Sequence, residues 1–424
     1  MTLTLEQPLQ KIFPDHDDVV MARSTSWNKF LKYGLPTKKQ EAWKYTDLTA
    51  IYQKYQINCV KVEAKSPSDH LFTKLDLSDE AYHFVFIDGA LIYADQHPSI
   101  LLAKTLPTFE PHQHIKHSTM LLAEATAIAG LHLRIKEHAI LDKPIHIHYV
   151  HSDACDHKVV NYQNIIELSP ASKCQVYEHF ISMSDQYSAI NLNTKIHLAE
   201  NAHYCYDFLS DQQQRKLVLT NTVMATLAKN AQFETFQLSG NSALTRFDFI
   251  IDLMAREAKF HANGICTIAD SAHSDYHFYI NHLASDTSSN VDFRAIASGK
   301  STLVFNAKGY VAEGVKNVQV LQNNRNIQIT DGAKINTKPE LEIYADDVVC
   351  THAATVGNLD QKALFYLQTR GIAYEKAVQL LLEGFVKAMI TELPRSSQVV
   401  TNYLAILQQA LLSLDSQSTE CYLL

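Results

Sequence analysis

One short pattern recurs along the middle of the chain at a nearly constant spacing. A small residue flanked by polar ones precedes an alternating run, and these small residues are Ser172, Ala202, Ala231 and Ala258, separated by steps of 30, 29 and 27 positions. A period of about 20–50 residues is typical of solenoids, because one unit buries its apolar face only against its neighbours. We therefore expect one tight corner in each coil of a repeating structure.

Short runs throughout the middle of the chain have the composition of β-strands. Four of them alternate in polarity and are rich in aromatic and β-branched residues, at 146–151, 174–180, 202–208 and 231–238. Because the repeated units are strands, the sequence favours a mainly β fold with a parallel β-helix over residues 80–350. An antiparallel sandwich with coincidental spacing is the alternative.

Helical patterns flank this β region. Residues 1–79 predict a mainly helical region, with one helix over 17–33 and a shorter one around Trp43. Residues 351–424 predict three amphipathic helices, the first of them capped by Asp360. Such a bundle is suited to docking a partner, and it could also cap the open end of the solenoid.

The charge balance argues against nucleic acid as a partner. Lys and Arg total 37 against 45 Asp and Glu, so the net charge is -8, whereas a phosphate backbone needs a basic surface. No apolar run approaches the roughly 20 residues that span a bilayer, so no membrane partner is expected. The N-terminus lacks the basic and apolar regions of a secretory signal, and we therefore expect a cytoplasmic protein.

The seven cysteines are scattered, and no two of them form a Cys-x-x-Cys pair. A self-contained zinc or iron–sulfur site normally has clustered ligands, so the sequence predicts none. The chain could still contribute one or two ligands to a site that it shares with another chain.

The segment SGKST at 298–302 resembles part of a phosphate-binding loop. That loop needs a glycine five residues before the glycine of Gly-Lys, and this chain has Arg294 there. The segment also lies among strand-like runs, without the required switch from strand to helix. We therefore expect no ATP hydrolysis by this chain.

Two groups of histidines could bind a metal ion. His112, His114 and His117 fall within six residues, and His146 and His148 alternate on one strand face. The chain has 21 histidines, so short groups arise by coincidence. We interpret both groups as polar surface residues.

An isolated β-helix also suggests a polysaccharide lyase or hydrolase, in which carboxylates flank a sugar. Asp248 and Asp252 would lie on one face of a regular strand and could form such a pair. The missing secretory signal argues against this function, and two acids on one strand face are more often simply solvated.

Cys350 and His352 are separated by one residue near the boundary between the strand-like and helical regions. If this boundary is extended, both side chains point to the same side, where a thiolate and an imidazole could serve as ligands. On spacing alone, the pair is no more than a chance occurrence.

The sequence around this pair resembles a known family. DDVVCTHAATVGNLDQKALFYLQTRGI (346–372) is similar to the C-terminal signature of the SufB/SufD iron–sulfur cluster assembly proteins, and EKAVQLLLEGFV (375–386) continues the match. NRNIQITDGAKINTKPELEI (324–343) extends it into the last coils, and GLPTKKQEAWKYTDL (34–48) looks like the N-terminal segment of the SufD branch. In one departure, Ala353 stands where Gly is frequent in the family.

The resemblance implies a right-handed parallel β-helix between helical ends and a non-enzymatic scaffold function. It implies pairing with SufB, docking of the SufC ATPase through the C-terminal helices, and ATP bound only by SufC. By matching position, His352 would be a ligand of a transient Fe–S cluster shared with SufB, and Cys350 a supporting thiol. The cluster type, the presence of a flavin and the formation of a homodimer stay open.

Overall fold

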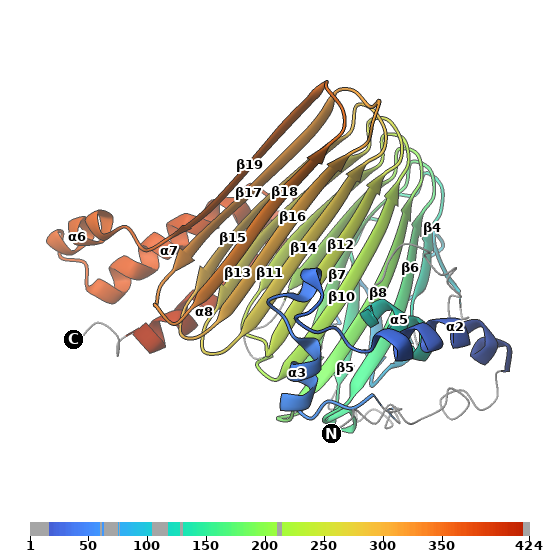
Figure 1. Ribbon diagram of the computed structural model, residues 1–424, viewed down its shortest axis with the longest axis horizontal. Helices are drawn as coiled ribbons and strands as arrows, with labels where there is room; N and C mark the ends of the chain where they lie inside the picture. Colours follow the sequence, from blue (N-terminus) through green and yellow to red (C-terminus); the bar gives the residue numbers. More distant parts are fainter. Residues whose placement is uncertain are drawn as a thin grey trace.

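The computed structural model describes residues 17–59, 62, 75, 77–103, 118–127, 130–209 and 214–418, and it is dominated by a parallel β-helix (Figure 1). Successive strands of the coil alternate between two sheets, one of ten strands and one of nine. The expected mainly β fold, a β-helix flanked by helices, is therefore confirmed, and the antiparallel sandwich is excluded.

The ten-stranded sheet holds β19 Val348–Gly357, β17 Val318–Gln328, β15 Ser288–Ala297, β13 Lys259–Ile268, β11 Gln232–Ser239, β9 His203–Leu209, β7 Lys173–Ser182, β5 Ile145–His151, β1 Tyr82–Ile87 and β2 Ala90–Ala94, in that order. The nine-stranded sheet holds β18 Lys334–Ile343, β16 Thr302–Val311, β14 His273–His282, β12 Leu244–Leu253, β10 Leu217–Leu227, β8 Ser188–Leu198, β6 Val159–Leu168, β4 His132–Ile135 and β3 Ile100–Ala103. Only the pairs β1–β2 and β3–β4, at the start of the coil, are antiparallel among these strands.

The expected corners are present in the structure. The first residues of the four recurring segments, Ala171, Asn201, Asn230 and Glu257, all have positive φ angles, between 52° and 65°. The small residue that follows each of them is at most 1% exposed. A left-handed residue turns the chain sharply, and a small side chain then fits inside the corner. The sequence repeat therefore records one corner in each coil.

The core lies between the two sheets and is built from stacked coils. Inward-facing aromatic rings on neighbouring strands lie almost parallel, as in Phe249–Phe278, whose centroids are 4.9 Å apart with an interplanar angle of 2°. Phe247 and Tyr276 repeat this arrangement two residues earlier on the same strands. Parallel pairing in register brings equivalent residues of successive coils together, so similar side chains form continuous rows.

The N-terminal elements lie along the nine-stranded sheet (Figure 1). They comprise α2 Asp17–Tyr33, the short 3₁₀ helix η1 Glu41–Trp43, α3 Leu48–Lys54 and, later in the chain, α5 Ser118–Thr126. A further 3₁₀ turn, η2, spans Asp153–Cys155. The predicted helix at 17–33 and the short helical segment around Trp43 are confirmed. The predicted histidine group at 112–117 lies outside the described residues.

The C-terminal helices are α6 Gln361–Thr369, α7 Tyr374–Thr391 and α8 Ser397–Ser418. Asp360 caps α6 as expected, because its carboxylate accepts hydrogen bonds from the backbone N–H groups of Lys362 and Ala363. These helices pack against outward-facing residues of the ten-stranded sheet, such as Phe236 and Ile265. They therefore cover one side of the solenoid, and the expectation that they cap its open end is wrong (Figure 1).

The end of the β region and the character of the helices can also be compared with the sequence predictions. The last strand, β19, continues to Gly357, so strand structure extends seven residues past the expected boundary at 350. None of the helices within the described residues combines the length and the apolar character that a membrane span requires.

Candidate functional site

The last coil of the β-helix has an open edge. Strands β18 and β19 are the end strands of their sheets, and within the described residues no further strand pairs with either of them. In β17 every second residue from Val318 to Asn326 is buried, whereas none of the ten residues of β19 is. An edge strand presents unpaired backbone N–H and C=O groups, so this end of the solenoid can accept another chain.

Cys350 and His352 both lie within β19 and not at its boundary with a helix. In the parallel register Cys350 is paired with Val320, and His352 with Gln322. Val320 and Gln322 are buried and belong to the inward-facing row of β17. The side chains of Cys350 and His352 therefore continue interior rows of the β-helix, at the point where the coil ends and these rows open to the outside.

The two residues differ in environment. Cys350 is half-buried and packs against a small apolar cluster that includes Val311, Val318 and Val320. Burial raises the pKa of the Cys350 thiol above its ordinary value, so the sulfur is protonated at neutral pH. His352 is exposed. The arrangement thus offers an accessible imidazole next to a shielded thiol.

The interior becomes polar as it approaches this edge. Val291 and Phe293 of β15 lie in the apolar core, and their register partners in the next coil are Gln322 and Asn324. Asn324 donates a hydrogen bond to the carbonyl oxygen of Phe293, at 3.1 Å, and a chain of amide contacts continues to the carbonyl of Thr355 through Asn326. Buried amides at this end can orient polar groups that an apolar core could not hold.

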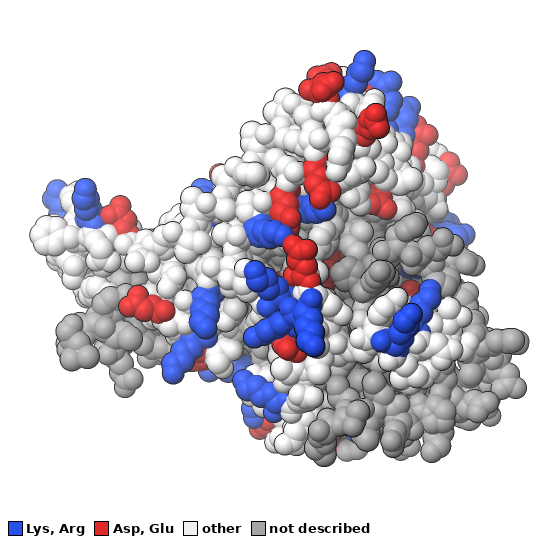
Figure 2. All heavy atoms as spheres, in the orientation of Figure 1, with Lys and Arg blue, Asp and Glu red and all other residues white. Residues whose placement is uncertain are grey.

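Strand β19 contains no Asp, Glu, Lys or Arg, although Asp346 and Asp347 just before it are exposed. Figure 2 shows mostly uncharged atoms along the edge that β17 and β19 form, while basic and acidic side chains gather over the middle of the nine-stranded sheet. The exposed residues of the last coil include Val349 and Tyr344, each 59% exposed. Exposed apolar side chains beside an unpaired edge are typical of a surface that contacts another protein.

A buried ion pair fastens the C-terminal helices to the ten-stranded sheet. Arg395, between α7 and α8, donates two hydrogen bonds to the carboxylate of Asp207 in β9, at 2.8 and 2.9 Å. The hydroxyl of Tyr403 in α8 donates a third, at 2.7 Å, and Glu234 lies 3.3 Å from the guanidinium of Arg395. No local sequence pattern indicates this attachment, which joins residues 188 positions apart. We define Arg395, Asp207, Tyr403 and Glu234 as the C-terminal anchor.

A second arginine lies beneath the N-terminal segment. Arg246 of β12 is fully buried, donates two hydrogen bonds to Asp248 at 2.8 Å each and also pairs with Asp275. The ring of Trp43 covers its guanidinium, with 3.6 Å between the guanidinium carbon and the ring centroid. The hydroxyl of Thr46 donates to Asp275. We define Arg246, Asp275, Trp43 and Thr46 as the N-terminal anchor.

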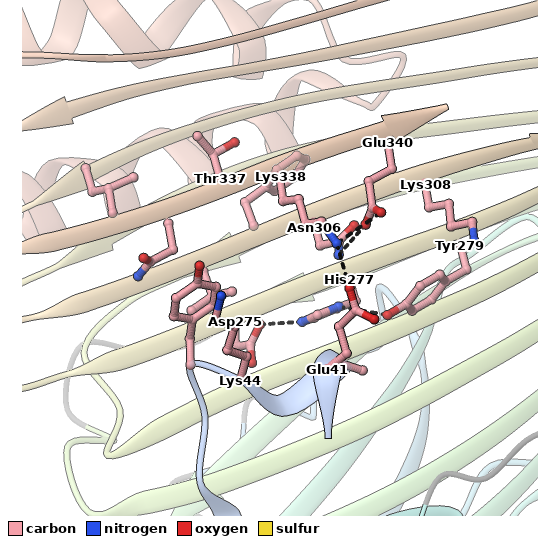
Figure 3. A pocket seen from close by; sticks show the side chains of 16 residues that line it. Glu41, Lys44, Asp275, His277, Tyr279, Asn306, Lys308, Thr337, Lys338 and Glu340 are labelled. Atoms are coloured by element: carbon pink, nitrogen blue, oxygen red, sulfur yellow. Dashed lines mark hydrogen bonds and ion pairs between the residues drawn. The ribbon is translucent and has the colours of Figure 1, made fainter. Parts of the chain in front are cut away.

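This anchor borders a groove of about 610 Å³ between the N-terminal segment and the nine-stranded sheet. In Figure 3 the side chains of His277 and Tyr279 lie on the sheet side, and Glu41 and Lys44 face them from the N-terminal segment. The Asp275 carboxylate is 2.7 Å from the imidazole of His277. The groove therefore holds paired charges that contribute to attachment.

Asp248 and Asp252 do not form a solvated or sugar-cleaving acid pair. Asp248 is 2% exposed and bound by Arg246, whereas Asp252 is half-buried and accepts a hydrogen bond from Asn281. The interpretation of both acids as solvated is wrong for Asp248, because the N-terminal segment covers this part of the sheet. A carboxylate held by an arginine is also poorly suited to act as a general acid.

The segment 298–302 is a corner of the coil. Gly299 has a φ of 64°, and a Cβ atom added there would lie 2.7 Å from the backbone nitrogen of Asp270 in the preceding coil. Strand β15 precedes this corner and strand β16 follows it. The glycine is therefore explained by a close backbone approach between coils and not by phosphate binding.

The interpretation of His146 and His148 as surface residues is wrong. His148 is only 4% exposed, and the imidazoles of His83, His146 and His148 lie together on the outer face of the ten-stranded sheet. His83 comes from β1, and no local motif connects it with His146 and His148, so only these two were visible as a pair in the sequence.

Comparisons with known proteins are consistent across the chain. A family model described as the SufBD core domain of SUF-system FeS cluster assembly matches residues 149–385, and one for the SufBD protein N-terminal region matches 6–108. The chain is 27% identical to the iron–sulfur cluster assembly protein SufD of Escherichia coli, over 90% of this chain and 91% of that protein. It is 23% identical to an iron–sulfur cluster assembly SufBD family protein of Synechocystis, over 86% and 85% of the two chains. For SufD of Bacillus subtilis the identity is 21%, over 66% of this chain and 64% of that protein.

Proposed function

Because this chain belongs to the SufBD family of iron–sulfur cluster assembly proteins, we propose that it is a non-enzymatic scaffold subunit that pairs with SufB through its open last coil. One observation carries the proposal: among the described residues no strand pairs with the outer side of β19, and the inward-facing row of the sheet ends there in Cys350 and His352. A partner strand added to this edge would bring its own side chains next to both residues.

The cargo at this junction would be a transient Fe–S cluster shared between the two subunits. The exposed imidazole of His352 offers a nitrogen ligand for iron, and ligands from SufB would complete the set. Cys350 would act as a supporting thiol, because its sulfur is shielded and must lose a proton before it can bind iron. The buried amides of Gln322 and Asn324 lie one coil behind and would fix the local geometry.

The C-terminal helices would dock SufC, which would bind and hydrolyse the ATP. They expose large apolar side chains, among them Phe365 at 68%, Tyr366 at 57% and Leu412 at 51%. Such residues on amphipathic helices suit a protein partner. The C-terminal anchor would pass a movement of these helices to the ten-stranded sheet, which is also the sheet that ends in β19.

The test is co-expression of this chain with SufB and SufC of the same organism, followed by mass determination and anaerobic cluster reconstitution. We expect a complex that contains all three proteins. His352→Ala should leave the complex intact and reduce the cluster yield several-fold, because one ligand is lost at the shared site. Thr351→Ala is the matched control, since Thr351 is an exposed neighbour that points to the other face of β19.

Three outcomes separate the parts of the proposal. If His352→Ala and Thr351→Ala give equal cluster yields, His352 is not a ligand. If His352→Ala abolishes pairing with SufB, its role is structural. If the wild-type chain forms no complex and elutes as a homodimer, the proposed pairing through β19 is wrong.

A further inference from the structure

A group of four histidines lies at the other end of the ten-stranded sheet, far along the coil from β19. His83 in β1 is the register partner of His146 in β5, and His148 in β5 is the register partner of His179 in β7. Their neighbours Phe84, Ile147 and Phe180 belong to the apolar core between the sheets, so the four imidazoles lie on the outer face. The residues come from three coils, and parallel pairing brings them together.

The group is covered by other parts of the chain. His148 is 4% and His83 3% exposed, and the carbonyl oxygen of Ser78, just before β1, lies 2.9 Å from Nε2 of His83. On the opposite side the ring of His146 packs edge-on against Tyr177, at 4.9 Å between centroids. The imidazoles are thus held in a shielded site and not on an open surface.

The hydrogen bonds orient His83 as a metal ligand. A carbonyl oxygen only accepts, so Nε2 of His83 carries the proton and its Nδ1 presents a lone pair. This pattern, an imidazole that donates its second N–H to a backbone carbonyl, is the usual support of a metal-binding histidine. The Nδ1 atom lies 3.2 Å from Nε2 of His148. Two nitrogen ligands of one tetrahedral zinc ion are separated by about 3.3 Å, given Zn–N distances of about 2.0–2.1 Å.

Two further nitrogens of the group lack hydrogen-bond partners in the structure. Nδ1 of His148 and Nε2 of His179 are buried without a hydrogen bond. Buried polar nitrogens without partners are costly, and a bound metal ion would give such nitrogens a partner.

We propose that His83, His146 and His148 bind one divalent transition-metal ion, with the adjacent His179 as a fourth nitrogen donor. One ligand nitrogen from each of the first three lies within 4.8 Å of the others, and the ring of His179 stacks on His148 at 4.9 Å. The donors are all imidazoles, without carboxylate or thiolate, which favours zinc-like ions over magnesium or calcium. The site is separate from Cys350 and His352, and the proposal does not depend on the function proposed above.

The test is titration of the purified, metal-free full chain with Co²⁺ and Zn²⁺. The wild-type chain should bind one Co²⁺ with the intense visible absorption of a tetrahedral nitrogen site, and Zn²⁺ should displace it. His148→Gln and His146→Gln should each weaken this binding by about 100-fold or more, because a direct ligand is lost. His197→Gln is the control, since His197 is exposed on the other sheet and bonded to Thr226.

Equal affinities of His148→Gln, His197→Gln and wild-type chain would overturn the proposal. The half-buried His146 provides the second variant if the substitution at His148 prevents folding. A crystal of the wild-type chain soaked in Zn²⁺ gives an independent answer, because anomalous scattering should place a zinc ion between His83, His146 and His148. Zinc found only elsewhere on the chain would also refute the site.

Discussion

The N-terminal segment and the C-terminal helices both attach to the outside of the β-helix through a buried arginine. In one anchor this arginine lies in the attached segment, and in the other it lies in the sheet. In the C-terminal anchor Arg395 comes from the attached segment, and the sheet supplies the carboxylate of Asp207. In the N-terminal anchor Arg246 belongs to the sheet, which also supplies both carboxylates. The attached segment adds an aromatic face and a hydroxyl, from Trp43 and Thr46.

This difference determines what is left when a segment detaches. Without the N-terminal segment, Arg246 keeps its buried ion pairs with Asp248 and Asp275, and the charge contact that is lost is the exposed pair between Lys338 and Glu41. Exposed pairs contribute only about 0–1 kcal/mol. Without the C-terminal helices, Asp207 loses Arg395, its buried ion-pair partner. We therefore expect the C-terminal helices to be the more firmly held segment.

The largest effect is expected when the C-terminal anchor loses its cation. Arg395→Met should lower the free energy of unfolding of the helical attachment by about 3–5 kcal/mol, because the Asp207 carboxylate stays buried with only the neutral donors Tyr403 and the Phe236 N–H group among its strong contacts. Hydrogen exchange of α7 and α8, together with urea unfolding, measures this loss.

Arg256→Met is the matched control, since Arg256 forms a surface pair with Asp286 and its side chain is 69% exposed. Exposed pairs contribute about 0–1 kcal/mol. The double variant Arg395→Met/Asp207→Asn should recover part of the loss, because the buried charge is removed. If Arg395→Met and Arg256→Met unfold alike, the contrast between the two anchors disappears.

A smaller effect is expected in the N-terminal anchor. Thr46→Val removes a buried hydroxyl that donates to Asp275, while Arg246 and His277 still pair with the same carboxylate. The expected loss is about 1.5–3 kcal/mol, the range of one hydrogen bond to a charged group. Faster hydrogen exchange, confined to α3 and η1, would report it.

The half-buried Thr37, whose hydroxyl lies 3.4 Å from the N–H group of Lys39, gives the control Thr37→Val, with little expected change. A loss from Thr46→Val as large as that from Arg395→Met would mean that the sheet does not hold Asp275 independently of the segment.

Local patterns explain which parts of the fold were predictable. The corners at Ser172 and Ala202 recur because each coil needs the same turn chemistry, and the helix after Asp360 follows from a cap and a periodic pattern. Membership of the SufBD family was also visible, since its signature is continuous in sequence. Cys350 and His352 were placed on one strand face by simple alternation, and the structure agrees.

What could not be predicted depends on contacts between distant coils. Alternation correctly places His148 on the outer face of its strand, but no sequence pattern shows that it is buried there beside His83. The contact between Arg395 and Asp207 likewise arises because the chain returns to the sheet after α7. Whether an outward-facing polar residue is solvated or buried is decided by which segment folds over it, and this is a property of the whole chain.

The smallest effect at neutral pH, and the sharpest contrast in acid, is expected from Glu234. A hydrogen bond from His203, together with the charge of Arg395, lowers the pKa of Glu234 from 4.5 to about 2. The unfolded chain therefore binds more protons between these values, so this carboxylate stabilises the fold above pH 4.5 and the contribution is lost as the pH falls towards 2. Burial opposes ionisation of Asp275, but Arg246 and His277 hold its pKa well below the ordinary value of 3.8.

Glu234→Gln should thus cost less than about 1 kcal/mol at pH 7, because Glu234 is on the partly exposed rim of the anchor. It should also flatten the decline in stability of α7 and α8 between pH 4.5 and 2, measured as urea midpoints and exchange rates. Glu200→Gln, at an exposed pair with Lys229, should leave that decline unchanged. If the stability of α7 and α8 falls with pH in Glu234→Gln as it does in the wild-type chain, Glu234 is not the source of the acid sensitivity of the C-terminal anchor. If the profile flattens, the attachment that is stronger at neutral pH is also the one that acid weakens first, because the carboxylate of the N-terminal anchor, Asp275, is fully buried and paired with Arg246.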